Sequence, residues 1–144
     1  MAARGYQGKD LEKIVDRYRS PGVVLFRIQD AAAFGRYKGP AVPCDFIGSI
    51  LGHPVMLDCK ETAEDRIPFS KMTRVQSSHQ LEAMLRFVGS NPHCVAGYLC
   101  SLKEGYVFAP ARKIVGEGSV KFDGTFRQIA HGLPFNLIWL ILGS

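Results

Sequence analysis

The spacing of hydrophobic residues along the chain predicts two helices separated by short strands. Apolar residues recur at helical intervals in segments 9–19 and 74–88, which indicates an amphipathic helix in each. Runs rich in β-branched and aromatic residues predict strands over 23–28, 45–51, 54–59, 93–102 and 106–109. The order helix, three strands, helix, two strands predicts a mixed α/β domain that spans the whole chain, with a sheet flanked by helices.

Segments rich in glycine, proline and polar residues connect these elements. Gly52-His53 predicts a tight turn that joins the strands 45–51 and 54–59 into a hairpin. Residues 29–43 and 61–73 are expected to form loops, because both combine polar residues with proline. We see no internal repeat, so residues 1–144 are expected to form a single domain.

The C-terminal part of the chain has a weaker pattern. A short helix or turn is expected near residues 126–130. The apolar stretch 133–142 has 10 residues, whereas a membrane helix needs about 20. It therefore predicts a buried last strand or a contact with a second copy of the chain.

Composition indicates a folded and mildly basic domain. Hydrophobic residues make up 47% of the chain, enough for a core, and the net charge of +5 is compatible with a polyanionic partner such as nucleic acid. No secretory signal or membrane span is evident, so we expect a cytoplasmic protein with no membrane partner. The four cysteines form no CxxC pair, which argues against structural zinc and favours reduced thiols.

Two acidic residues and a lysine stand at the ends of the predicted hairpin strands. Asp45 begins one strand and Asp58 lies near the end of the other, so an in-register hairpin places them opposite each other. Lys60 lies two residues beyond Asp58 and therefore on the same face of its strand. The flanking residues are apolar, which favours charges that terminate core strands. The alternative is a solvated strand end, because Asp-x-Lys is a common sequence.

Two carboxylates at such close range repel each other unless one takes up a proton or a cation neutralises them. Mg²⁺ prefers oxygen ligands and is commonly held by one or two carboxylates together with waters and phosphate. A lysine beside the metal can orient the attacking water or stabilise negative charge on phosphorus. The three residues therefore predict metal-assisted phosphodiester hydrolysis with Mg²⁺, or Mn²⁺ in its place.

The order of motifs around these residues resembles the RecU family of Holliday junction resolvases, which belongs to the PD-(D/E)XK nuclease superfamily. The motifs are Gly8-Lys9-Asp10-Leu11-Glu12, Pro43-Cys44-Asp45, Asp58-Cys59-Lys60-Glu61-Thr62, Ile67-Pro68-Phe69 and His79-Gln80-Leu81. The resemblance covers residues 5–110. It implies a restriction-endonuclease-like α/β core with a mixed central sheet flanked by helices.

The resemblance assigns the metal site residue by residue. Asp45 and Asp58 match the two metal-binding acids, although RecU proteins usually carry Glu where Asp58 stands. Lys60 matches the catalytic lysine. The backbone carbonyl of Cys59 would be a further metal ligand, as in related nucleases. Attack by a water activated at the metal would then follow the in-line course of phosphodiester hydrolysis.

The resemblance also covers two helical positions and the segment before Asp45. Glu12 matches an acid that contacts the metal through water, while a first-turn acid that favours the helix dipole is the alternative. Gln80 matches a glutamine that holds a water or a phosphate oxygen, while a surface glutamine is the alternative. RecU proteins carry a long protruding stalk before the first metal-binding acid, and residues 29–43 can supply only a reduced one.

Basic residues near the proposed site in the sequence are candidates for contacts with DNA. The candidates are Arg4, Lys9, Lys71, Arg74 and His79, together with Arg36 and Lys38 in the reduced stalk. Contacts of this kind give binding that depends strongly on salt and reads few bases. Each basic residue taken alone is more often a solvated charge than a DNA contact.

These features predict a Mg²⁺-dependent, structure-selective DNA endonuclease that resolves Holliday junctions in recombination and repair. Because resolution needs two symmetric nicks, a homodimer is expected, with Phe135, Leu137, Trp139 and Ile141 as interface candidates. The alternatives are another nuclease of the superfamily, acting on DNA ends, flaps or single strands, and an inactive nuclease-fold module that binds DNA. A compact member encoded by a phage would act in the cytoplasm of the host cell.

Overall fold

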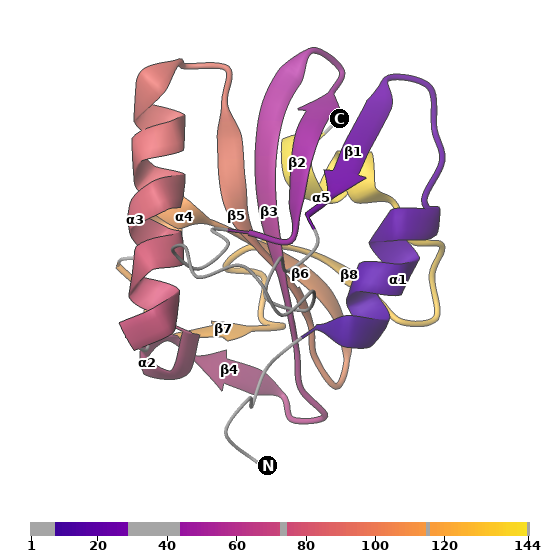
Figure 1. Cartoon of the computed structure of the whole chain (residues 1–144). Coiled ribbons are helices and arrows are strands. Elements are labelled where there is room, and N and C mark those ends of the chain that lie inside the picture. The colour runs from indigo at the N-terminus through magenta and orange to yellow at the C-terminus, as the bar shows by residue number, and fades with distance from the viewer. Residues whose placement is uncertain (1–7, 29–43, 73–74, 115, 144) are drawn as a thin grey trace, which may run out of the picture.

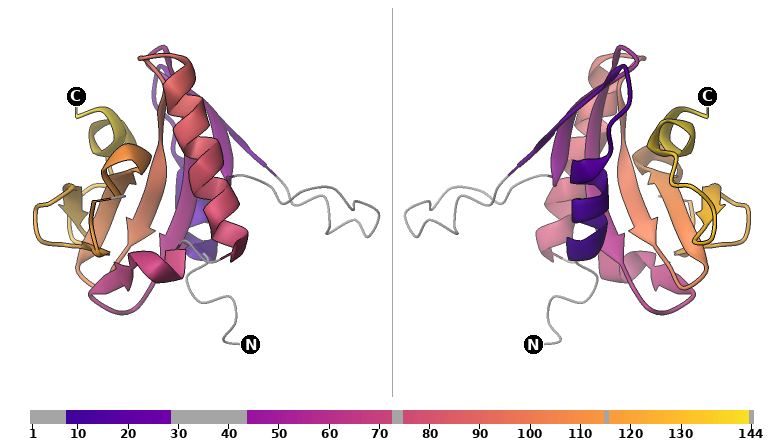
Figure 2. Two further views of the ribbon diagram at one scale, coloured as in Figure 1. Left: turned by 90° about the vertical axis from the view of Figure 1, so that its left-hand side faces the viewer. Right: turned by 90° about the vertical axis from the view of Figure 1, so that its right-hand side faces the viewer.

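The computed structural model describes residues 8–28, 44–72, 75–114 and 116–143, which form a twisted sheet covered by helices on both faces (Figures 1 and 2). In chain order the elements are α1 (Lys9–Arg17), β1 (Val23–Arg27), β2 (Phe46–Ile50), β3 (His53–Glu61), β4 (Arg66–Pro68), α2 (Phe69–Met72), α3 (Val75–Ser90), β5 (Val95–Ser101), β6 (Gly105–Pro110), α4 (Ala111–Ile114), β7 (Ser119–Lys121), β8 (Arg127–Ala130) and α5 (Leu137–Leu142). The predicted mixed α/β architecture is confirmed.

Six strands form the main sheet in the order β1-β2-β3-β5-β6-β8, and β4 pairs with β7 in a small separate sheet. Among the described strands of the main sheet, β3 and β5 are the one parallel pair. Parallel strands need a long crossover connection, and α3 lies within that connection. As a result, β3 lies inside the sheet between β2 and β5, while β1 and β8 lie at opposite ends (Figure 2).

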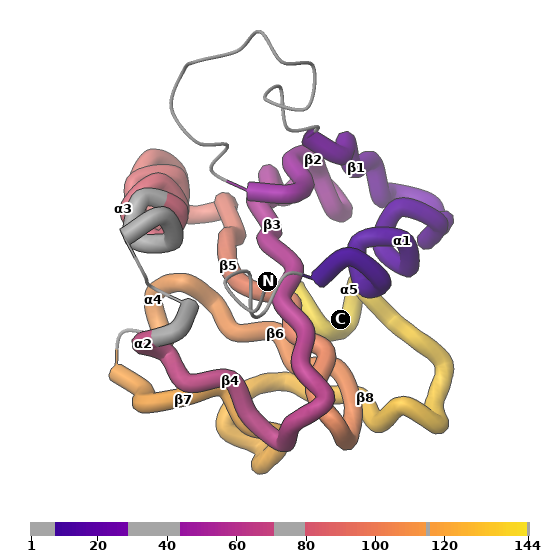
Figure 3. Tube along the Cα trace, turned by 60° about the horizontal axis from the view of Figure 1, so that its bottom comes forward, coloured from indigo at the N-terminus to yellow at the C-terminus, as the bar shows by residue number. Residues whose placement is uncertain are grey.

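The sheet separates two hydrophobic clusters. On one face, α1 packs against β3 and β1 and α5 packs against β8 and β6, with Leu11 and Leu140 fully buried in the cluster between them and the sheet. On the other face, α3, α4 and the small sheet pack together around residues such as Met84. Helices α1 and α3 accordingly lie on opposite sides of β3 (Figure 3). Because successive strand residues point to opposite faces, Cys59 belongs to the α1 side and Asp58 faces α3.

The turn of the β2–β3 hairpin lies one residue earlier than predicted. β2 ends at Ile50 and β3 begins at His53, so Leu51 and Gly52 form the turn instead of Gly52-His53. Both turn residues have positive φ, 49° for Leu51 and 83° for Gly52. Positive φ at both central positions is the requirement of a type I′ turn, whose twist matches that of the paired strands. This two-residue turn places Phe46 opposite Leu57.

Residues 61–73 contain regular structure, so the predicted loop is wrong. Glu61 is the last residue of β3, and β4 and α2 follow it. β4 pairs with β7 through the register Ile67↔Val120, which buries both side chains completely. A three-residue strand has no recognisable local pattern. It is stabilised by a partner strand that is distant in the sequence, and the sequence pattern does not reveal that partner.

The apolar C-terminal segment forms the helix α5, so the predicted buried strand is wrong. The side chain of Asn136 accepts a hydrogen bond from the backbone N–H of Trp139 at 3.0 Å and caps the first turn. Gly143 ends the helix in the left-handed conformation, with φ of 78°. Asparagine before an apolar run and glycine after it are ordinary helix boundary signals. Here these boundary residues decide the conformation, because the run itself suits either a helix or a strand.

The burial of α5 also changes the predicted dimer contact. Leu137 and Ile141 pack within the chain, against the cluster that contains α1 and β2, and so are not available to a partner. Trp139 stays 37% exposed. Residues Arg127–Ala130 form the strand β8, where the pattern predicts a helix or turn. In the part of the chain that the structure describes, no helix is long and apolar enough to cross a membrane.

The Asn136 cap gives a first test of the C-terminal structure. Asn136→Ala leaves the Trp139 N–H without its partner and is expected to lower the free energy of unfolding by about 1 kcal/mol. Asn136→Ser keeps a hydrogen-bond acceptor and should lower the free energy of unfolding much less. Urea denaturation of the three proteins measures the difference. Equal stability of the Ala and Ser variants would contradict the capping role.

Candidate active site

The pairing of β2 with β3 brings two acidic side chains together. Phe46 of β2 lies opposite Leu57 of β3, so Asp45, one residue before β2, lies opposite Asp58. The two carboxyl groups are near enough for each to change the pKa of the other. The hairpin register therefore produces the acid pair that the spacing predicts.

Lys60 and Gln80 both contact Asp58, which is 2% exposed. The Lys60 Nζ atom lies 2.9 Å from Asp58 Oδ2, and these two residues share one face of β3. Gln80 comes from α3 on the same side of the sheet, and its Nε2 donates a hydrogen bond to Asp58 Oδ1 at 3.1 Å. The Oε1 atom of Gln80 is buried and has no hydrogen-bond partner among the described residues. Asp58 Oδ1 thus accepts a hydrogen bond from α3, while Oδ2 has the Lys60 ammonium group at ion-pair distance and no hydrogen-bond partner within the described part of the chain.

Burial sets the electrostatics of the acid pair. Burial raises the pKa of Asp45 to about 7, the neighbouring charge of Asp58 adds to the rise, and a hydrogen bond from the Cys59 backbone opposes it. Burial also raises the pKa of Asp58, while the Lys60 ammonium group opposes this rise. The site therefore holds two carboxyl groups against one ammonium group, and near neutral pH it favours the uptake of positive charge.

The backbone of Cys59 connects the acid pair to α1. Its N–H donates to Asp45 Oδ2 at 2.8 Å, and its carbonyl accepts from the Gly8 N–H at 3.2 Å. A carbonyl oxygen has two lone pairs, so one acceptor position remains for another ligand. The close approach of the two backbones requires glycine. A Cβ atom at position 8 would lie 2.7 Å from the Cys59 carbonyl carbon.

Glu61 holds the start of α1 against the end of β3. One carboxylate oxygen of Glu61 accepts from the backbone N–H of Asp10 at 2.9 Å and of Leu11 at 3.2 Å. No side chain at Gly8 caps α1, so Glu61 satisfies N–H groups that a helix start leaves free. A negative charge at this end also favours the helix dipole. The carboxylate of Glu61 is thus engaged by α1 and separate from the acid pair.

Glu12 lies near the acid pair but has its own partner. Its Oε1 forms an ion pair with Arg27 Nη2 of β1 at 2.9 Å. The Glu12 side chain is 12% exposed, and its charge contributes to the raised pKa of Asp58. The structure therefore brings Glu12 to the edge of the site, on the α1 side of the sheet. Its predicted contact with a metal through water stays a prediction.

The donor set around the acid pair fits a hard divalent cation. Mg²⁺ is often held by one or two carboxylates with waters completing its coordination, and a backbone carbonyl is a compatible ligand. Asp45 and Asp58 supply the carboxylates, and the Cys59 carbonyl lies on the same backbone segment. No group of three or more His, Cys, Asp or Glu side chains within the described residues is arranged to hold a metal. A cation held by these two carboxylates and one carbonyl would keep part of its water shell.

The cysteines near the site are not suited to nucleophilic chemistry. All four cysteines are free. Burial raises the pKa of Cys44 to about 12 and that of Cys100 to about 12. The reactive form of cysteine is the thiolate. These two thiols therefore stay protonated near neutral pH.

The predicted DNA contacts fall mostly outside the described structure. Arg4, Arg36, Lys38 and Arg74 lie outside the described residues, and the structure describes the backbone but not the side chains of Lys71 in α2 and His79 in α3. Lys9 is exposed at the first residue of α1, next to Gly8 and hence near the Cys59 carbonyl. The DNA contacts predicted for this set remain predictions.

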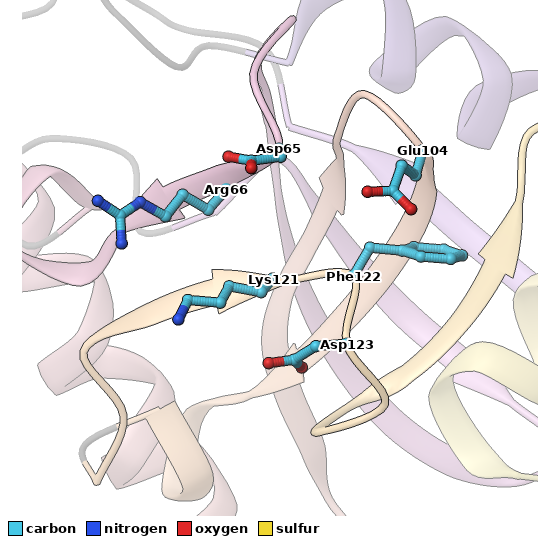
Figure 4. Close-up of a pocket in the computed structure, with 6 residues that line it drawn as sticks. All are labelled: Asp65, Arg66, Glu104, Lys121, Phe122 and Asp123. Carbon is cyan, nitrogen blue, oxygen red and sulfur yellow. The ribbon is translucent and has the colours of Figure 1, made fainter.

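The two described pockets lie away from the acid pair. One, of about 300 Å³, lies between the small sheet and the β5–β6 turn (Figure 4). It is lined by Asp65, Arg66, Glu104, Lys121, Phe122 and Asp123. The other, of about 370 Å³, is lined partly by Lys113, Arg127 and Trp139. Both pockets are open to solvent and lined by polar and apolar residues, and neither is lined by Asp45, Asp58 or Lys60.

Sequence reasoning assigned no role to four residues that shape the site, two of which, Gly8 and Glu61, belong to the motifs named above. Gly8 permits the contact between α1 and β3, Glu61 caps α1, and Arg27 pairs with Glu12. Tyr98 of β5 lies beside Asp58 in the sheet. The position of Gly8 directly before a predicted helix is a weak local signal of a close backbone contact. The others depend on strand pairings and helix docking that no local pattern reveals.

Two comparisons of the sequence with known proteins found no match. Neither a scan against protein-family models nor a search of curated proteins finds a relative of this chain. The side-chain geometry and the motif resemblance are therefore the basis of the function proposed below.

The raised pKa of Asp45 predicts an unusual dependence of stability on pH. The folded protein binds this proton more tightly than the unfolded chain, so without divalent cations stability is lost as pH rises from about 4 toward 7. Asp45→Asn keeps an acceptor for Cys59 and should reduce that loss. Chemical denaturation in EDTA between about pH 4 and pH 7 measures the free energy of unfolding, with Asp65→Asn, a substitution of an exposed acid, as the control. Parallel curves for Asp45→Asn and the wild type would contradict the raised pKa.

The Gly8 contact predicts a second effect on stability. Gly8→Ala places a Cβ atom against the Cys59 backbone and is expected to lower the free energy of unfolding by about 1–3 kcal/mol. Gly89→Ala in α3 is the matched control, because no atom lies within 4 Å of the added Cβ. That substitution should stabilise the protein by about 0.5–1 kcal/mol. If both variants were stabilised, α1 would not pack as described.

Proposed function

We propose that this protein is a divalent-cation-dependent DNA endonuclease that acts on branched DNA, most specifically on four-way junctions. The observation that carries the proposal is the pair of the partly buried Asp45 and the buried Asp58, with Lys60 on the same strand as Asp58. Two carboxyl groups at this range, one of them buried, need a proton or a positive charge to offset their own charge, and the single Lys60 ammonium group offsets at most one of them. Phosphodiester hydrolysis is the chemistry to which these groups are suited.

The fold supports the same proposal. The main sheet is mixed and flanked by helices, which is compatible with the restriction-endonuclease-like core that the RecU resemblance implies. Gln80, which the resemblance assigns to the helix beside the site, does contact Asp58. Three of the motifs, on α1, β3 and α3, thus supply residues that act on Asp58, namely Glu12, Lys60 and Gln80.

Each residue has a distinct task in the proposed reaction. Asp45 and Asp58 would hold the cation, with the Cys59 carbonyl as a further ligand. The bound cation would supply Lewis-acid activation and neutralise charge on the phosphate. Gln80 fixes the Asp58 carboxylate through its hydrogen bond, and Lys60 orients water by hydrogen bonding and stabilises negative charge on the phosphate.

Resolution of a junction further requires two coordinated nicks. One chain has one acid pair in the described residues, so we propose a homodimer as the active form. Residues 29–43 belong to the connection between β1 and β2, and this segment ends two residues before Asp45. A basic segment attached at this point would reach DNA bound in the site, which is why Arg36 and Lys38 are proposed to contact the branch.

Substitution of the central residues tests the chemistry. Asp58→Asn and Lys60→Ala are expected to retain junction binding in EDTA but to slow Mg²⁺-dependent cleavage by more than about 100-fold, because each removes a charge needed for hydrolysis. Asp65→Asn and Lys103→Ala make the same chemical changes at exposed positions and should cleave at the wild-type rate. Gel-shift and single-turnover nicking assays give the two readouts. Wild-type cleavage by either site variant would overturn the assignment.

A panel of DNA substrates tests the specificity. We expect the wild-type protein, with Mg²⁺ or Mn²⁺, to nick a labelled four-way junction faster than a flap, a linear duplex or a single strand, and EDTA to abolish nicking. Faster cleavage of flaps or ends would identify a nuclease of different specificity. Absence of cleavage on every substrate, with no divalent cation bound in calorimetry, would identify a module that only binds DNA.

A further inference from the structure

Tyr98 is a fully buried residue at the centre of the site. In the parallel pairing of β3 with β5, Tyr98 lies opposite Asp58, and Cys100 lies opposite Lys60. Tyr98 therefore faces the α3 side of the sheet together with Asp58 and Lys60. Its side chain is 0% exposed and packs in the cluster that contains Met84 and Ile67. The aromatic ring thus lies directly beside the acidic group on the neighbouring strand.

The ring of Tyr98 lies near the Lys60 ammonium group. Lys60 Nζ is 5.9 Å from the ring centroid, within the range of about 6 Å in which a cation is attracted to an aromatic face. The Lys60 side chain is only 13% exposed, so water screens this attraction weakly. Lys60 therefore has two anchors, the Asp58 carboxylate at 2.9 Å and the ring of Tyr98.

These two anchors respond differently to a bound cation. In the proposed function, Asp58 binds a divalent cation, which competes with Lys60 for the same carboxylate. The ring carries no formal charge and is not a ligand for Mg²⁺, which prefers oxygen donors. The contact with the ring is therefore the one that Lys60 retains. Without it, the long lysine side chain would be free to leave the site.

We propose that Tyr98 is a positioning residue whose aromatic ring holds the Lys60 ammonium group in the site when Asp58 binds a divalent cation. This inference rests on the proposed function, and it assigns a task to a residue outside the acid–acid–lysine set. Tyr98 acts through Lys60 and is not itself a reacting group.

The hydroxyl group of Tyr98 separates the role of the ring from that of the phenol. This oxygen is buried and has no hydrogen-bond partner among the described residues. Removal of an unpaired buried polar group is neutral or stabilising. Tyr98→Phe should therefore keep both the fold and the support for Lys60, whereas Tyr98→Leu removes the aromatic face and retains an apolar side chain.

A matched control distinguishes positioning from general loss of packing. Phe108 of β6 is as deeply buried as Tyr98 but belongs to the hydrophobic cluster on the opposite face of the sheet. Phe108→Leu makes a comparable change in the core without touching Lys60. Urea denaturation identifies conditions in which all variants are fully folded, and the other measurements are made there.

Nuclear magnetic resonance detects the contact independently of cleavage. Protons held over an aromatic face resonate upfield, and the ε-methylene protons of Lys60 report this effect. Their signal is observed in protein with ¹³C-labelled lysine and is assigned by its absence in Lys60→Arg. We expect an upfield signal in wild type, Tyr98→Phe and Phe108→Leu, with and without Mg²⁺, and its loss in Tyr98→Leu. An unchanged signal in Tyr98→Leu would overturn the proposal.

Single-turnover cleavage of a four-way junction tests the consequence. Tyr98→Leu is expected to lower the cleavage rate about tenfold at saturating Mg²⁺ without weakening DNA binding. Tyr98→Phe and Phe108→Leu should cleave at nearly the wild-type rate. A slow Tyr98→Phe, or a fast Tyr98→Leu, would overturn the positioning role while the nuclease proposal stands. A wild-type protein that cleaves no DNA would overturn the nuclease proposal, and the positioning role with it.

Discussion

The close approach of two carboxyl groups, one buried and one partly buried, is the constraint on which the site depends. Asp45 and Asp58 are held opposite each other by the hairpin of β2 and β3, and neither can move away without breaking the register. Burial raises the pKa of both. Only a bound proton, the neighbouring Lys60 or a cation relieves this conflict. The pairing of the two carboxyl groups is unfavourable by itself. It is maintained because the rest of the sheet contributes enough free energy of folding to offset its cost.

The two faces of β3 near the site carry different kinds of side chain, apolar on one face and charged on the other. On the α1 side, Leu57 and Cys59 belong to a hydrophobic cluster. On the α3 side, Asp58 and Lys60 meet Gln80 from the helix and Tyr98 from β5. The crossover through α3 is what places Gln80 and Tyr98 there, because it makes β5 a parallel neighbour of β3. The same connection thus completes the sheet and supplies the residues that surround the acid.

Helix α1 completes the region from the other face. Gly8 and Glu61 attach the start of this helix to the end of β3 through backbone and side-chain hydrogen bonds. Glu12 projects from the first turn of α1 and pairs with Arg27 of β1. These contacts determine where the Cys59 carbonyl and the Glu12 charge lie relative to the acid pair. Docking of α1 is therefore part of the site as well as part of the core.

The sequence alone determined the elements with strong periodicity and the acid pair, because strand alternation and a two-residue hairpin turn are local properties. It did not reveal β4, which forms only by pairing with β7. The hydrophobic pattern of the C-terminal apolar run suits either a helix or a strand, and the local boundary signals at Asn136 and Gly143 decide for the helix. Tertiary structure alone placed Tyr98 against Lys60 and Glu61 against α1. Those contacts join segments whose pairing depends on which apolar faces can be buried together, a property of the whole fold and not of any local pattern.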